Sequence, residues 1–261
     1  MRKIMKGLII AVIAVIGFVV TSCGDGNGST TDPCKDGHDW NWIITTHPNF
    51  TTITEGEQTK TCNRCSETDG TQSYPILELG DTGPAGGKII YIDPAGFEVT
   101  STTAAFTTYT AYYLEAAPAN AVGGTGAQTS MMWTTRLSEP YPNVTGTLFT
   151  IGSGRNNTAL IIAAEKAAYP SDTYIYAALA CDNYFVAGYE TFNDWFLPSR
   201  NELNQLCLRQ AYVGLSSSDR FWSSSQSQFN SSSAWHQNFA SGWQDTHYKS
   251  FGYDVRPVRA F

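Results

Sequence analysis

The composition of this chain excludes two broad classes of protein. Its 261 residues carry 16 Lys and Arg against 23 Asp and Glu, which gives a formal charge of −7, and aromatic residues make up 13%. An acidic chain lacks the basic face that binds phosphates, so we expect no nucleic-acid partner. So many Tyr, Phe and Trp side chains must be buried or bind a ligand, which excludes disorder over most of the chain.

The N-terminal segment predicts export and lipidation. Residues 1–22 carry three basic residues and then an apolar run at 8–20, which is shorter than the roughly 20 residues of a membrane-spanning helix but typical of a signal peptide. The run ends at Val20-Thr21-Ser22-Cys23, which resembles a bacterial lipobox. We expect acylation of Cys23, a flexible tether at 23–33 and a lipid anchor in the cell membrane, at the surface of the outer membrane. An ordinary signal peptide is the alternative.

Residues 34–73 hold a Cys/His cluster with the spacing of a metal site. Cys34 and His38 precede Cys62 and Cys65, and three thiolates with one imidazole are ligands that zinc prefers. About 40 residues cannot fold by apolar burial alone, so we expect a structural zinc ion as a staple. Four protein ligands leave no open position, so we expect no catalytic cofactor. A disulfide between Cys34 and Cys62 or Cys65 is the alternative.

This segment is expected to be a small β-rich minidomain. Apolar and Thr-rich stretches predict short strands at 40–44, 51–54 and 59–62. The segment resembles a small Cys/His repeat of surface proteins in treponeme-like bacteria, on the residues His38-Asp-Trp40-Asn-Trp42 and Thr61-Cys62-Asn-Arg-Cys65.

The main domain, 79–261, is expected to have an α+β fold. It begins with a glycine-rich turn whose Gly83–Lys88 stretch is one residue too short for a phosphate-binding loop. Ser199 and Glu202 form a capping box at the start of a helix. The pattern predicts helices at 157–165, 172–181 and 199–207, and strands at 89–92, 112–116, 131–133, 221–225, 234–239 and 255–261. The first and last strands could pair, and Cys181 and Cys207 lie in helices, either paired or as buried thiols.

The same domain resembles a known family. Trp195-Phe-Leu-Pro-Ser-Arg-Asn-Glu-Leu203, Phe221-Trp-Ser-Ser-Ser225 and Val255-Arg-Pro-Val-Arg-Ala-Phe261 are similar to the C-type lectin-like domains of the formylglycine-generating-enzyme type in bacterial lipoproteins. Some of these proteins are targets of diversity-generating retroelements, which rewrite the C-terminal segment at adenines. The resemblance implies a C-type lectin-like fold with a variable ligand-binding face near the C-terminus, for a protein or glycan partner.

The last 40 or so residues divide into framework and candidate contact positions. We expect Trp222, Trp235, Phe239, Val255, Val258 and Phe261 to pack. The residue types at 229–233, 236, 245–248 and 250–254 can all arise from an Asn codon by changing only adenines. Trp243 cannot, so it is either a framework residue or evidence against diversification. Because neighbours in a strand face opposite ways, burial of Trp235 predicts that His236 is exposed. The candidate ligand-binding residues are Phe229, Asn230, His236, Asp245, His247, Tyr248, Phe251 and Tyr253.

The alternatives to ligand binding are an inert surface-coat protein and an enzyme. The resemblance implies that the enzymes of this fold need two closely spaced cysteines near the C-terminus, and no Cys follows Cys207. No Ser-His-Asp ordering or carboxylate pair stands out, so we do not expect an enzyme. Glu139-Pro140-Tyr141 and Asn193-Asp194-Trp195 depart from the motifs of calcium-dependent sugar binding.

Overall fold

A computed structural model describes residues 34, 37–50, 52–122, 130–215 and 219–261 of the chain. The signal peptide, Cys23 and the tether predicted above lie outside the described residues. Among the helices of the described part, none has both the length and the apolar character to cross a membrane.

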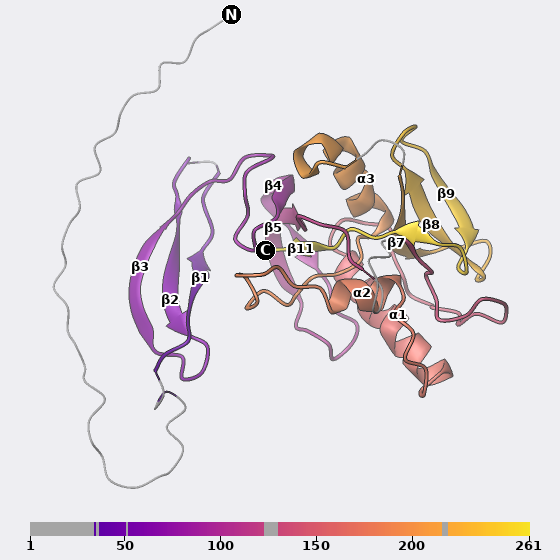
Figure 1. Cartoon of the computed structure of the whole chain (residues 1–261). Helices are drawn as coiled ribbons and strands as arrows, with labels where there is room; N and C mark the ends of the chain where they lie inside the picture. Colours follow the sequence, from indigo (N-terminus) through magenta and orange to yellow (C-terminus); the bar gives the residue numbers. More distant parts are fainter. Residues whose placement is uncertain (1–33, 35–36, 51, 123–129, 216–218) are drawn as a thin grey trace, which may run out of the picture.

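The architecture is mixed α+β, with three sheets and few helices (Figure 1). Figure 1 shows the N-terminal minidomain at one side, the strands β4, β5 and β11 in the middle with the C-terminus beside them, and strands β7, β8 and β9 at the far side. The helices α1, α2 and α3 lie between the last two groups.

The minidomain is an antiparallel sheet of three strands in the order β1-β2-β3: β1 (Trp40–Thr46), β2 (Gly56–Cys62) and β3 (Thr68–Tyr74). The strand predicted at 51–54 is wrong, because Thr52–Thr54 belongs to the turn between β1 and β2, where Thr54 makes only an isolated bridge to Asn49. β3 was not predicted because it is polar and six of its seven residues are exposed.

The second sheet has the order β11-β5-β4, from β4 (Lys88–Val99), β5 (Tyr109–Ala116) and β11 (Val258–Ala260). The last strand therefore pairs with β5 and not with the first strand of the domain, which corrects that expectation. The C-terminal Phe261 continues the pairing, because its carbonyl accepts hydrogen bonds from the N–H groups of Tyr112 and Tyr113.

The third sheet carries the candidate contact residues. Its order is β6-β10-β7-β8-β9, from β6 (Ser130–Met131), β10 (Tyr253–Asp254), β7 (Arg220–Gln226), β8 (Ser233–Asn238) and β9 (Gln244–Tyr248). β10 runs parallel to β7, and the other pairs are antiparallel. The strand expected at 131–133 is the shorter β6, and the strand expected at 255–261 is reduced to β11 of the second sheet. The residues of β9 were expected to form a loop.

The helices are α1 (Gly154–Ala168), α2 (Ala177–Asp182) and α3 (Arg200–Leu208), followed by a short 3-10 turn at Gln210–Val213. α1 begins three residues before the prediction, so Asn157 is no cap. Its buried amide instead donates to the Leu148 carbonyl at 2.7 Å and to Ser224 Oγ at 3.1 Å. α2 begins five residues later than expected.

Two sequence motifs meet at the start of α1 and α3. The capping box of Ser199 and Glu202 is present as predicted. The fully buried Glu202 carboxylate also accepts hydrogen bonds from the N–H groups of Gly152 at 2.8 Å and Gly154 at 3.4 Å. A Cβ on Gly154 would lie 2.2 Å from Glu202 Oε2, so glycine is required for this approach. Burial raises the pKa of Glu202 to about 7, although these donors oppose the shift.

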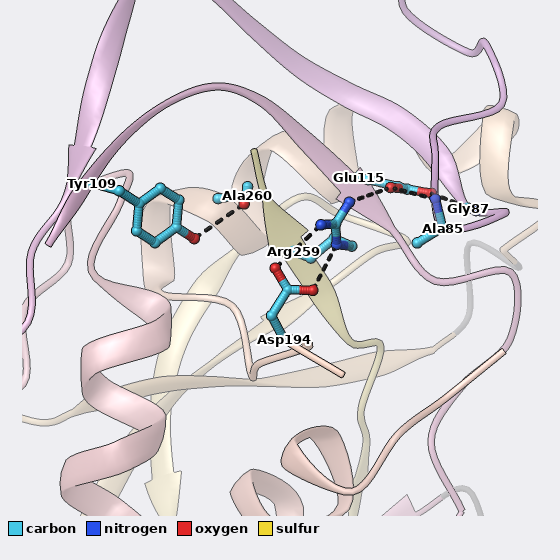
Figure 2. A network of polar contacts seen from close by, with 7 residues as sticks. All are labelled: Ala85, Gly87, Tyr109, Glu115, Asp194, Arg259 and Ala260. Atoms are coloured by element: carbon cyan, nitrogen blue, oxygen red, sulfur yellow. Dashed lines mark hydrogen bonds and ion pairs between the residues drawn. The ribbon is translucent and has the colours of Figure 1, made fainter. Parts of the chain in front are cut away.

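The glycine-rich turn before β4 wraps around a carboxylate of the protein itself. Ala85 and Gly87 donate their N–H groups to Glu115, with the Gly87 bond at 2.6 Å (Figure 2). A Cβ on Gly83 would lie 2.4 Å from the Glu115 carboxyl carbon. The turn therefore binds an internal anion, which explains its superficial likeness to a phosphate-binding loop.

The minidomain contacts the main domain through the end of β1 and the turn that follows it. Ile44 and Phe50 pack with Tyr113 and Phe261 in one apolar cluster. Cys34, Cys62 and Cys65 are not part of this cluster, so packing holds one end of the minidomain sheet and the Cys/His group lies at the other.

Candidate ligand-binding face and metal site

Strand pairing brings three of the candidate contact residues, His236, Asp245 and His247, onto one face of the third sheet. Trp222, His236 and Asp245 are paired in register across β7, β8 and β9. Paired residues point to the same side of a sheet, so Arg220, two residues before Trp222, and His247, two residues after Asp245, share that face.

This face contains a hollow of about 290 Å³. Its floor is aromatic: the ring centres of His236 and Tyr253 are 4.6 Å apart, and those of Trp222 and Tyr253 are 4.7 Å apart. The residues that line the hollow are Arg220, His236, Asn238, Ser241, Trp243, Asp245, His247 and Tyr253. We call this surface the hollow face.

The prediction that His236 is exposed is wrong. His236 is 7% exposed and lies against Trp222 and Tyr253, whereas Trp235 is half-buried on the opposite face, under the Arg200 guanidinium at 3.9 Å. The two residues do face opposite ways, as alternation requires. The error came from assuming that the face with Trp235 is the more deeply buried one.

The other candidate residues differ in where they lie. Tyr253 is 8% exposed and belongs to the floor of the hollow, so it is a buried lining residue and not an exposed contact. Phe251 is 49% exposed, and its ring lies 3.9 Å from that of His247. Phe229 at 88% and Tyr248 at 51% are exposed but do not line the hollow, and Tyr248 follows His247 directly in β9 and so points to the other side of the sheet. Asn230 and Asp245 are also exposed, although each accepts a backbone hydrogen bond from a near neighbour in the chain.

Four lining residues were not predicted: Arg220, Asn238, Ser241 and Trp243. Arg220 could have been found from alternation with Trp222. Trp243 is 74% exposed, so it is not a packed framework residue. Of the expected framework positions, all are buried except Trp235.

Electrostatics favour a neutral His236 in the hollow. Burial, with help from His247 and Arg220, lowers the pKa of His236 to about 4 and outweighs the opposite effect of Asp245. The Nδ1 atoms of His236 and His247 are buried with no hydrogen-bond partner among the described residues. The hollow thus offers two imidazole rings beside one carboxylate and one guanidinium.

Lys249 fixes the segment beside the hollow face. It follows exposed Tyr248 directly but is fully buried, with Nζ 2.6 Å from the Pro142 carbonyl and 2.7 Å from Gln226 Oε1. Its ammonium also lies 4.4 Å from the centre of the Trp133 ring. Burial lowers the pKa of Lys249 to about 7.

The four predicted metal ligands lie together in the minidomain. The ligand atoms of Cys34, His38, Cys62 and Cys65 are all within 4.8 Å of one another. Cys34 Sγ is 3.5 Å from Cys62 Sγ, and Cys65 Sγ is 3.4 Å from His38 Nδ1. Ligands on one tetrahedral zinc ion would be about 3.5–3.8 Å apart, so the group is close enough to bind a metal.

The surroundings of this group also suit a cation. Backbone N–H groups of Arg64 and Cys65 point at the Cys62 sulfur, and although burial opposes them, they lower the pKa of Cys62 to about 5. Burial and the two neighbouring thiols raise the pKa of Cys34 to about 12. His38 Nε2 lies 3.5 Å from Glu67 Oε2, the arrangement in which a carboxylate orients a ligating imidazole.

No disulfide is present among the described cysteines. The side chains of Cys34, Cys62, Cys65, Cys181 and Cys207 form no disulfide bond. Cys181 in α2 and Cys207 in α3 are buried in two different apolar clusters. Both are therefore buried thiols, one of the two outcomes that the sequence left open.

Comparisons with known proteins give one family. The crystal structure of a fimbrial protein from Bacteroides ovatus ATCC 8483 has a TM-score of 0.42 and 14% identity, over 80% of this chain and 57% of that one, so this chain spans little more than half of that protein. No curated protein sequence matches the chain. The family model of the Lcl C-terminal domain matches residues 125–259, just over half of the chain. That span includes every strand and residue of the hollow face, and the chain belongs to the Lcl C-terminal domain family.

Proposed function

We propose that this protein is a lipid-anchored surface protein that binds a protein or glycan partner through the hollow face. The observation that carries the proposal is a concave aromatic floor with exposed aromatic side chains beside it: Trp243 lines the hollow, and Phe251 lies against His247. Large exposed apolar side chains gathered at one hollow are typical of recognition surfaces. Aromatic rings supply contact area at a low cost in side-chain entropy, and the histidines, Asp245 and Asn238 supply directional hydrogen bonds.

The segment is built so that its exposed residues can change without loss of the fold. Phe229, Tyr248 and Phe251 project from turns and an edge strand, while Trp222 and Phe239 are buried beneath. This division supports the proposal that a retroelement diversifies the segment, as in the C-type lectin-like variable proteins that the sequence resembles. A near-copy of the last 120 or so bases of the gene in the flanking DNA would test this.

The binding proposal is tested with two aromatic residues of nearly equal exposure. Phe251 is 49% exposed and its ring lies against His247 of the hollow face, and Tyr174 is 50% exposed outside that face. Cells that display the full chain are applied to arrays of glycans and host-surface proteins, and the binding pattern is compared for wild type, Trp243→Ser, Phe251→Ser and Tyr174→Ser. We expect the first two changes to weaken the same signals at least tenfold and Tyr174→Ser to leave them unchanged.

An inert coat protein would give a different result. Wild type would then show no reproducible signal, or all three variants would keep it. Either outcome would contradict the proposal that the hollow face recognises a partner. There would then be no reason to prefer a binding function for this protein over an enzyme or an inert coat protein.

Anchoring is proposed from the lipobox and has its own test. Cells fed a labelled fatty acid should incorporate it into wild type but not into Cys23→Ser, and the variant should leave the membrane fraction. Label retained by Cys23→Ser would contradict the assignment.

We propose that the metal bound by Cys34, His38, Cys62 and Cys65 is a structural zinc ion. Four protein ligands complete a tetrahedral shell, so the ion would supply folding energy and no reaction. Elemental analysis of the purified chain should find one equivalent of zinc, and Cys65→Ser should lose it.

A further inference from the structure

A second cavity opens where the minidomain faces the main domain. It has a volume of about 310 Å³, and strand β1 supplies one wall while β5, β11 and residues 192–194 supply another. A neighbouring hollow of about 220 Å³ is lined by α1 and residues 193–196. Arg155 and Asp194 line both, and neither cavity includes a residue of the hollow face.

Arg155 has no acidic partner among the described residues. No carboxylate oxygen of the described part lies within ion-pair distance of its guanidinium. The guanidinium is held instead by aromatic rings, with its carbon 4.4 Å from the centre of Phe106 and 5.5 Å from the centre of Tyr109. The Arg155 side chain also hydrogen-bonds the Tyr109 hydroxyl. These contacts orient the arginine and leave its other N–H donors for a planar anion.

The nearby carboxylates are already occupied (Figure 2). Both oxygens of Asp194 accept hydrogen bonds from Arg259, at 2.8 and 3.2 Å, and Glu115 accepts from Arg259 and from the backbone of the glycine-rich turn. Figure 2 shows the Arg259 guanidinium between the two carboxylates. The structure therefore satisfies these three groups internally, whereas Arg155 has no ion pair among the described residues.

Two further groups near Arg155 lack partners. The indole N–H of Trp195, which lines the smaller hollow, is buried without a hydrogen-bond partner among the described residues. The Nδ1 atom of His47, which lines the larger cavity, is also buried without one. Because buried polar atoms are nearly always hydrogen-bonded, two such atoms beside a guanidinium without an ion pair indicate a missing ligand.

Apolar side chains form much of the remaining wall. Trp42, Ile43, Phe192 and Phe261 line the larger cavity, together with the polar Asn41 and Thr110. A multiply charged anion such as phosphate would meet the charges of Asp194 and of Asp182, which lines the smaller hollow, whereas a carboxylate carries a single charge and matches the fork of one guanidinium. The volume is at the lower end for small-molecule sites.

We propose that this interdomain cavity binds a small organic carboxylate with an apolar or aromatic body, whose carboxylate pairs with Arg155. The apolar body would lie against the β1 side chains, so the site needs both the minidomain and the main domain. This site is independent of the hollow face and of the function proposed for it.

The test compares an acid with its amide on the intact, metal-loaded chain. Isothermal titration uses 3-phenylpropionate and 3-phenylpropanamide, together with a tripeptide ending in Phe as free acid and as amide. We expect at least one free acid to bind at least tenfold more tightly than its amide, and the acid that binds identifies the source as a small molecule or a peptide terminus. Equal affinity of each acid and its amide, or no binding by any probe, overturns the proposal.

Two arginine variants locate the site. Arg155→Gln should abolish the preference for the acid over the amide. Arg136→Gln is the matched control, because the Arg136 guanidinium also stacks on a ring, at 3.7 Å from Tyr169, but does not line either cavity. An unchanged acid preference in Arg155→Gln contradicts the proposal. If that variant does not fold, the acid–amide comparison on wild type still decides.

Discussion

The contact between Glu202 and the start of α1 predicts a large effect of a small substitution, Gly154→Ala. The added Cβ would lie 2.2 Å from Glu202 Oε2 and 2.8 Å from the Phe196 ring, and both neighbours are buried. Overpacking in a closed core costs about 1–3 kcal/mol. Displacement of Glu202 also removes N–H donors from a buried carboxylate, which costs a further 1–3 kcal/mol or so. The expected loss in free energy of unfolding is therefore about 2–6 kcal/mol.

Thermal and urea unfolding of the purified chain measure this loss. For a domain of this size each kcal/mol lowers Tm by roughly 2–4 °C, so the midpoint should fall by about 4–24 °C. Gly252→Ala is the control, because its Cβ would approach only the Ser130 hydroxyl and Cβ, and the hydroxyl can rotate away. If the free energy of unfolding of Gly154→Ala lies within about 1 kcal/mol of the wild-type value, the contact between Glu202 and the start of α1 does not stabilise the fold as proposed.

Three further predictions concern the hollow face and the minidomain. The pKa of His236 falls to about 4 in the fold, so the unfolded state binds the extra proton between pH 6.5 and 4. The free energy of unfolding of wild type relative to His236→Gln should drop by up to about 3 kcal/mol as pH falls through that window, and a flat difference would contradict the burial. The raised pKa of Glu202 makes the free energy of unfolding increase as pH falls from 7 to 4.5, which is opposite to the effect of His236. The difference between wild type and His236→Gln is therefore measured, because it removes the contribution of Glu202. Removal of the metal by a chelator should unfold the minidomain and change its tryptophan fluorescence, while the Tm of the main domain stays the same. Simultaneous unfolding of the minidomain and the main domain would show that they do not fold separately. Trp243→Ser should change the free energy of unfolding by less than about 0.5 kcal/mol, because Trp243 is exposed. Trp222→Ser should lower it by about 3 kcal/mol or more, because Trp222 is fully buried. Equal effects would contradict the assignment of Trp222 to the floor of the hollow and Trp243 to its exposed rim.

Local signals predicted part of the fold. The capping box of α3 and the strands around Trp222 and Trp235 were predicted because their patterns are decided by near neighbours in the chain. β3 and β9 were not, because Thr68–Tyr74 and Gln244–Tyr248 are mostly polar and become strands only by pairing with β2 and β8. Such pairing depends on residues distant in the sequence, which periodicity does not report.

The candidate sites were also predicted only where the signal comes from spacing along the chain. Cys/His spacing predicted correctly that Cys34, His38, Cys62 and Cys65 lie together, close enough to bind a metal, because a knuckle and a second pair have few other uses at that spacing. The prediction for His236 failed, because alternation gives two faces but does not say which is covered. The sheet is covered on both sides, with Tyr253 packed on one and Arg200 on the other. The Arg155 cavity could not be predicted, since its walls come from the minidomain, α1 and the C-terminus.

Lys249 would limit the diversification that we propose for this segment. A Lys codon consists of adenines in its first two positions, so mutagenesis at adenines across 245–254 would also rewrite Lys249. A single adenine change gives Lys249→Thr, which leaves the Pro142 carbonyl and Gln226 Oε1 without their donor in a buried site. Each unsatisfied acceptor costs about 1–3 kcal/mol, so Lys249→Thr should lower the free energy of unfolding by about 2–6 kcal/mol.

Related copies of the gene give the test of this limit. Among copies that are displayed on cells, codon 249 should stay Lys while codons 245–248 and 250–254 differ. Lys249→Thr in the present chain should reduce display, and Tyr248→Ser should not, because Tyr248 is half exposed and makes no buried hydrogen bond among the described residues. Stable, displayed copies with varied residues at 249 would show that the ammonium is not needed, and the framework would then rest on the aromatic side chains alone.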